Sequence, residues 1–72
     1  MDHFSKNLIR LRQQAGFSQE ELAKKVEIHP KQVIRWESGK STPHLASRKR
    51  VAELFGISIP QLMGEEAIDF NA

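Results

Sequence analysis

Three observations predict an all-α domain built from five short helices. Each of the four glycines follows a stretch with helical spacing of apolar residues, where a helix commonly ends on a residue in the left-handed conformation. Capping-box sequences mark two helix starts, and no alternation of polar and apolar residues is long enough for a strand. We therefore expect helices over residues 4–15, 18–26, 29–38, 44–55 and 58–63.

The first two expected helices are defined by their apolar faces and by a capping box. On the first helix, the apolar face consists of Phe4, Leu8, Leu11 and Ala15. The second helix begins at Ser18, whose hydroxyl can accept from a free backbone N–H while the side chain of Glu21 accepts from another. The inward residues of this helix are Leu22, Ala23 and Val26.

The third expected helix begins at a proline and turns one face inward. Pro30 stands at the first helical position, where its missing N–H leaves no hydrogen bond unmade. Val33 and Trp36 are three residues apart, so they share a face of the helix. This spacing favours burial of Trp36 over its alternative role, which is stacking on a base.

The fourth and fifth expected helices complete one apolar core. The apolar residues of the fourth helix are Leu45, Val51, Ala52 and Phe55. Ser58 and Gln61 form the second capping box, and Ile57 and Leu62 have the spacing of a hydrophobic staple across it.

Length and composition predict one small domain without cofactor chemistry. We place this domain at residues 1–63 and a short acidic tail at 64–72, either disordered or docked through Ile68 and Phe70. The chain has no cysteine, and its three histidines lack the spacing of helical metal ligands. It has no catalytic motif, and no apolar run approaches the roughly 18 residues that cross a bilayer. We expect a soluble cytoplasmic protein that is not an enzyme and holds no metal or cofactor.

The charge is distributed unevenly along the chain. Residues 29–50 hold six basic side chains and one acidic side chain, whereas residues 51–72 hold four acidic and no basic ones. A basic excess on one segment suits a surface that neutralises phosphates, and an ordinary solvated face is the alternative.

The outward face of the third helix carries side chains that can read bases. With 100° between successive residues, Lys31 and Arg35 lie opposite Val33, and Gln32 flanks them. Lysine and arginine donate to guanine in the major groove, and glutamine suits adenine. On an isolated helix such residues indicate only a solvated face. On the second helix of a helix-turn-helix, within a basic segment, they favour DNA.

The sequence resembles the phage repressor and Cro family of helix-turn-helix proteins, the XRE-like regulators. The blocks that carry the resemblance are LRQQAGFSQEELAKKV, RWESGKSTP, VAELFGIS and QLM, in this order and over about residues 4–63. The family implies a compact five-helix, lambda-repressor-like domain whose second and third helices form the helix-turn-helix. It also implies double-stranded operator DNA as the partner, commonly bound by a homodimer.

The resemblance assigns roles to individual residues. Base-contacting positions are matched by Pro30, Lys31, Gln32 and Arg35. Positions that contact the sugar-phosphate backbone are matched by Ser18, Gln19, His29, Ser38 and Lys40. Gln19 is also expected to support the reading helix, and Arg12 and Glu37 match a partly buried ion pair between the first and third helices.

Four residues depart from the family pattern. Glu27 stands in the turn where glycine is usual, so either the backbone avoids a positive φ there or Glu27 is strained. Arg48 replaces a usual leucine, and Ile9 and Ile34 stand at positions that are usually polar. Ile9 suggests a contact with another protein.

The sequence as a whole predicts a sequence-specific DNA-binding transcriptional regulator, a repressor in the favoured interpretation. The alternative is a protein-binding module of the same fold, such as the antitoxin of a toxin–antitoxin pair or an anti-repressor. Outward donors on the third helix favour DNA over that alternative.

Overall fold

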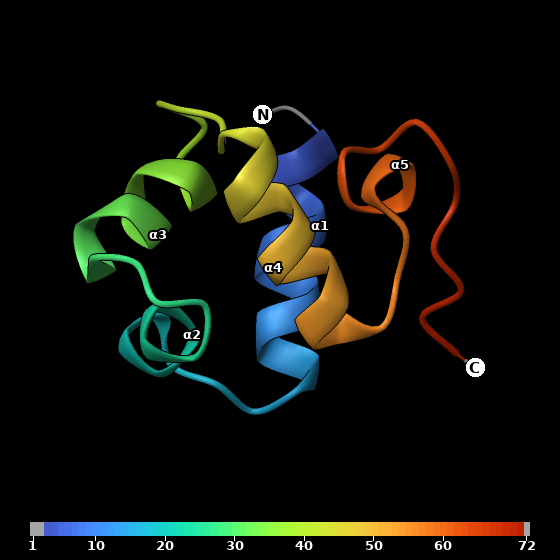
Figure 1. The fold of residues 1–72 in the computed structure, drawn as a ribbon. Helices are drawn as coiled ribbons and strands as arrows, with labels where there is room; N and C mark the ends of the chain where they lie inside the picture. Colours follow the sequence, from blue (N-terminus) through green and yellow to red (C-terminus); the bar gives the residue numbers. More distant parts are fainter. Residues whose placement is uncertain (1–2, 72) are drawn as a thin grey trace.

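The computed structural model describes residues 3–71, and all the regular secondary structure of these residues is helical (Figure 1). Its helices are α1 (His3–Gln14), α2 (Gln19–Lys25), α3 (Pro30–Glu37), α4 (Leu45–Phe55) and α5 (Ile59–Leu62). The predicted all-α class is confirmed over these residues. The first two residues of the expected domain and the last residue of the expected tail lie outside the described part.

The helices form two groups that meet on α1. Helix α3 packs against α2 and against α1, while α5 packs against α4 and α1. In Figure 1 the α2–α3 pair lies at one side of the molecule, and α5 with the C-terminal segment lies at the opposite side. No helix in the described part of the chain is both long and apolar enough to span a membrane.

A single apolar core lies between these groups. Phe4 of α1 and Trp36 of α3 make an edge-to-face contact within it, with 6.1 Å between ring centroids. The buried apolar residues are Phe4, Leu8, Leu11, Leu22, Ala23, Val26, Val33, Trp36, Val51, Ala52 and Leu62. Two residues expected in the core are exposed instead. Ala15 follows the last residue of α1, and Leu45, 58% exposed, is the first residue of α4.

Local hydrogen bonds begin the helices where the sequence predicts. Both capping boxes form: the hydroxyl of Ser18 accepts from the N–H of Glu21, and that of Ser58 accepts from the N–H of Gln61. The side chains of Glu21 and Gln61 accept in return from the two serine N–H groups. Pro30 is the first residue of α3 as expected.

The chain turns sharply after α5 at Gly64. This residue has φ +85°, and a Cβ atom on it would collide with the Cβ of His3. Glycine is therefore the residue that allows the C-terminal segment to pass this close to the start of α1.

The acidic C-terminal segment is docked on the domain. Ile68 and Phe70 are half-buried and pack against the core. The guanidinium carbon of Arg10 lies 4.1 Å from the centroid of the Phe70 ring, and Nε2 of Gln14 donates to the Phe70 carbonyl over 2.8 Å. Of the two alternatives for this segment, the structure shows the docked one.

Three residues outside the turn also depart from the family pattern, and they differ in burial and in contacts. Arg48 is half-buried on α4, and its Nε donates to the carbonyl of Pro43 over 2.9 Å, so it closes the loop before α4. Ile9 is half-buried on α1, whereas Ile34 is 48% exposed on α3.

Candidate nucleic-acid interface

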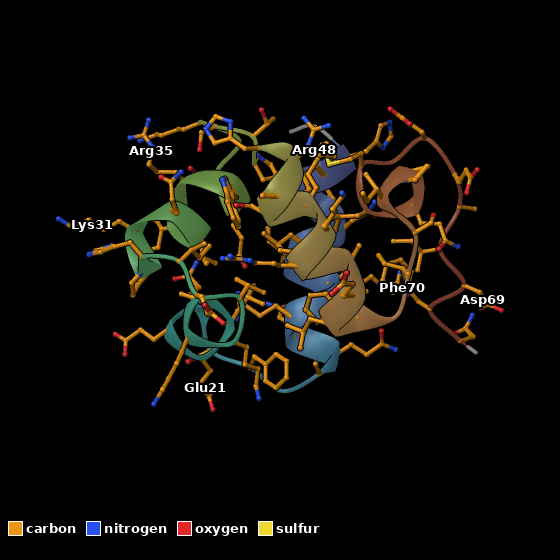
Figure 2. The ribbon with its side chains drawn as sticks, viewed as in Figure 1. Glu21, Lys31, Arg35, Arg48, Asp69 and Phe70 are labelled. Atoms are coloured by element: carbon orange, nitrogen blue, oxygen red, sulfur yellow. The ribbon has the colours of Figure 1, made fainter. Side chains whose placement is uncertain are left out.

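Helix α3 is anchored by one face and presents the other to solvent. Val33 and Trp36 are buried, with exposed fractions of 0% and 1%. Lys31, Gln32 and Arg35 are exposed. Figure 2 shows the side chains of Lys31 and Arg35 extending from α3 away from the rest of the molecule. Burial on one side fixes the helix, so its donors are held at a defined place on the surface.

The start of α3 is fixed by His29 and Pro30. His29 precedes the helix, and its Nδ1 accepts from the N–H of Lys31 over 3.1 Å. The histidine is exposed and Pro30 is half-buried. Both residues lie beside Lys31, so the structure keeps these three predicted contact residues together at the N-terminal end of the outward face.

The end of α3 leads into an exposed loop that carries two further predicted contact residues. The hydroxyl of Ser38 donates to the Arg35 carbonyl over 3.0 Å, and the N–H of Lys40 donates to the same carbonyl over 3.0 Å. Lys40 follows Gly39, whose φ of +78° turns the chain out of the helix. Both Ser38 and Lys40 are exposed. Cationic and hydroxyl groups at such a place can meet phosphate oxygens.

The two predicted contact residues at the start of α2 already have partners inside the protein. Ser18 uses its hydroxyl to cap α2, and its N–H donates to the Glu21 carboxylate over 2.8 Å. Hydrogen bonding from the Ser18 N–H to the Glu21 carboxylate, followed by that from the Ser18 hydroxyl, holds the pKa of Glu21 below its ordinary value. Gln19 donates from Nε2 to Oε1 of Glu37 over 3.0 Å. Its amide nitrogen carries a second N–H that can donate to a phosphate.

Glu37 joins three helices through one buried carboxylate. Arg12 of α1 donates from Nε to Oε2 over 2.5 Å and from Nη2 to Oε1 over 3.0 Å. Gln19 adds its bond from α2, and Nη1 of Arg12 also donates to the Phe17 carbonyl over 2.9 Å. The structure thus brings Arg12 and Glu37 together and gives Gln19 a supporting contact with α3.

The turn between α2 and α3 is built without glycine. Glu27 has φ +59°, so of the two alternatives for this residue the structure shows the strained one. Its N–H donates to the carbonyl of Lys24 over 3.3 Å, and the next N–H, of Ile28, donates to that of Ala23 over 2.9 Å. These bonds satisfy carbonyl groups at the end of α2 while the chain reverses toward α3.

Two residues that support this surface were not found from the sequence. Ser5 is fully buried, and its hydroxyl donates to the Trp36 carbonyl over 2.7 Å, which ties α1 to α3. The only sequence feature that points to Ser5 is its position as a small polar residue beside the apolar face of α1. Arg50 of α4 donates from Nη1 to the Val26 carbonyl over 3.4 Å, and nothing in the sequence distinguishes it from its basic neighbours.

The described residues hold no group of three or more histidine, cysteine, aspartate or glutamate side chains that could bind a metal. The chemistry of the surface is instead that of exposed donors. Lysine, arginine and glutamine on one helix face, with a cationic loop beyond it, can donate to base edges and to phosphates.

Comparisons with known proteins agree with this geometry. Residues 8–62 match the family model HTH_3, described as helix-turn-helix. The HTH-type transcriptional activator BcrR of Enterococcus faecalis is 35% identical over 66 residues, which are 90% of this chain and 32% of that protein. The chain therefore spans about a third of the length of this curated relative.

Solved structures show the same fold. A transcriptional regulator from Listeria innocua superimposes with a TM-score of 0.84 and 26% identity, covering 100% of this chain and 67% of that one. The SOS-response transcriptional repressor LexA from Eubacterium rectale gives a TM-score of 0.81 at 23% identity, covering 96% of this chain and 73% of that one. At that identity the second likeness shows the fold alone.

Proposed function

This chain belongs to the helix-turn-helix family of DNA-binding transcriptional regulators, and we propose that it is a sequence-specific repressor that reads the major groove through α3. In this proposal the protein acts in the cytoplasm and is not an enzyme. The observation that carries the proposal is the two-sided character of α3. Its buried face fixes the helix, and its exposed face carries Lys31, Gln32 and Arg35.

These three side chains supply base contacts. Arg35 and Lys31 donate to O6 and N7 of guanine, and the Gln32 amide both donates to and accepts from adenine. Pro30 at the start of the helix provides an apolar contact for a thymine methyl group. Each base pair presents a distinct pattern in the major groove, so such a set of contacts can select a sequence.

Contacts with the sugar-phosphate backbone set the register of α3 on the duplex. Lys40 and Ser38 lie beyond the end of the helix, and His29 lies before its start. Ser18 and Gln19 approach the backbone from the start of α2. Contacts of this kind position the domain but carry no sequence information.

Two copies bind one operator as a homodimer in this proposal. A single reading helix contacts only a few base pairs, and a two-fold pair reads two half-sites separated by about one helical turn. Repression then follows where the operator overlaps a promoter, because the bound dimer occupies the site that the polymerase needs.

The second candidate function is a protein-binding module of the same fold, such as an antitoxin or an anti-repressor. The half-buried Ile9 on α1 is the feature that favours it. The exposed donors of α3 favour DNA, because a module that binds only protein does not require three outward donors on that helix.

Selection of binding sites from random duplexes tests the proposal. The wild-type protein should enrich a palindrome with half-sites about one helical turn apart. A control variant in which Lys31, Gln32 and Arg35 are all alanine should enrich no motif. Enrichment of no motif by the wild-type protein would refute sequence-specific recognition. In vitro transcription from a promoter that carries the selected site then distinguishes a repressor from an activator.

A further inference from the structure

Arg50 connects α4 to the turn of the helix-turn-helix. It lies on the exposed face of α4, and its Nη1 donates to the carbonyl of Val26 over 3.4 Å. Val26 is the C-cap of α2, directly after its last residue, Lys25. Within residues 3–71, none of the other hydrogen bonds described joins α4 to α2 or α3.

The carbonyl that Arg50 contacts directly precedes the residue of the turn that has a positive φ. The next residue, Glu27, has φ +59°, a conformation that glycine adopts easily and glutamate does not. Carbonyl groups in the last turn of a helix also lack a partner within it and form the negative end of the helix dipole. A guanidinium at this point therefore stabilises the end of α2 beside the strained residue.

Two different arginines contact the helix-turn-helix, one at the last residue of α3 and one in the turn before it. Arg12 binds Glu37, the last residue of α3, through two hydrogen bonds. Arg50 binds Val26, four residues before α3 begins at Pro30. The first contact ties the end of α3 to α1, and the second ties the turn before α3 to α4.

We propose that Arg50 is a positioning residue for DNA recognition, which holds the turn at Glu27 in its positive-φ conformation and thereby sets the orientation of α3. The effect on DNA rests on the proposed function. The energetic link between Arg50 and Glu27 does not depend on it, since that link is a property of the folded domain alone.

Thermal unfolding of R50Q, E27G and the double variant tests the link. Arg50→Gln should lower the Tm by about 4 °C in the wild-type background. In the E27G background the same change should lower it by less than half as much, because glycine needs no support at positive φ. Lys49→Gln removes the same charge from a neighbouring exposed residue and should leave the Tm nearly unchanged. Equal losses from R50Q in both backgrounds would overturn the proposal.

DNA binding tests the positioning role, at a temperature at which every variant is folded. R50Q should weaken binding to the selected operator about fivefold and leave binding to random duplex unchanged, and E27G should restore most of the loss. A loss of stability alone cannot change this ratio while the protein is folded. Equal weakening on both duplexes, with a shallower salt dependence, would make Arg50 a phosphate ligand and overturn the proposal.

The two proposals fail in different ways. If the wild-type protein selects no motif, the proposed function fails, while the Tm values still decide whether Arg50 and Glu27 are coupled. If the wild-type protein selects a motif but R50Q recognises it with unchanged affinity, the positioning role fails and the proposed function stands.

Discussion

Arg12 and Glu37 form a two-point ion pair between α1 and the last residue of α3, with an Nε–Oε2 distance of 2.5 Å and an Nη2–Oε1 distance of 3.0 Å. Their side chains are only 14% and 6% exposed. Gln19 donates to the same carboxylate. The three helices that form and support the proposed DNA surface are therefore joined at one buried acidic group.

Removing the carboxylate should destabilise the domain strongly. We expect Glu37→Ala to lower the free energy of unfolding by about 3 kcal/mol, because the Arg12 charge stays largely buried without its partner. Urea unfolding measures the loss, and Glu53→Ala, on the exposed face of α4, is the control for loss of a surface glutamate. Losses that simply add in the Arg12→Ala, Glu37→Ala double variant would show that the pair is not coupled.

The capping box of α2 should make stability depend on pH. The N–H of Ser18, and next its hydroxyl, hold the pKa of Glu21 below the ordinary value of 4.5 that applies to the unfolded chain. A lowered pKa stabilises the fold above the ordinary value, and this stabilisation is lost as the pH falls through the lowered one.

Glu21→Gln keeps an acceptor in the capping box but does not titrate. We therefore expect the Tm of the wild type to exceed that of E21Q above about pH 5, with a difference that shrinks at lower pH. Thermal unfolding at several pH values measures both curves. Parallel curves through this range would show that Glu21 contributes no pH dependence.

Features with a local cause were predictable from the sequence. The capping boxes at Ser18 and Ser58 and the proline at the start of α3 need only their immediate neighbours, and all three are confirmed. The four glycines also have the expected positive φ. Helical spacing alone does not say how far the core reaches along a helix, so Ala15 and Leu45 were wrongly placed in it.

Contacts between distant residues were harder to predict. Ser5 meets Trp36 and Arg50 meets Val26 only after the helices have packed, and the local sequence around each is equally compatible with an exposed side chain. The contact between the first and third helices through the buried ion pair was expected from the family resemblance, since no local pattern joins residues 25 positions apart. The outward face of α3 could be derived from periodicity, but its contacts with DNA remain predictions.

Arg35 should affect which sequence is preferred. We expect Arg35→Ala to relax the preference at one or two base pairs and to cost about 1–3 kcal/mol on the selected operator, because a base-reading donor is lost. Competition binding against duplexes with single base changes measures the preference. The same loss on every duplex would contradict a base-reading role for Arg35.

Lys40 should affect all sequences alike. It lies in the exposed loop after α3, and its expected partner is a phosphate. Lys40→Ala should weaken binding to every duplex and reduce the slope of log affinity against log salt by about 1, since one fewer counterion is released. Titrations at several salt concentrations measure the slope, and an unchanged slope would remove Lys40 from the set of phosphate contacts.

Phe70 should stabilise the domain without taking part in DNA binding. The ring lies against the Arg10 guanidinium and packs on the core, at the side of the molecule opposite α3 (Figure 2). We expect Phe70→Ala to lower the free energy of unfolding by about 1 kcal/mol, since a cation–π contact and partial burial are lost. Hydrogen exchange should then increase in the C-terminal segment, where the Gln14 bond to the Phe70 carbonyl no longer has a packed ring to hold it in place. Operator affinity should be unchanged, because the surface formed by α3 does not include this segment. Weaker operator binding by the folded variant would mean that the segment contributes to the DNA complex, either directly or by joining two copies of the chain.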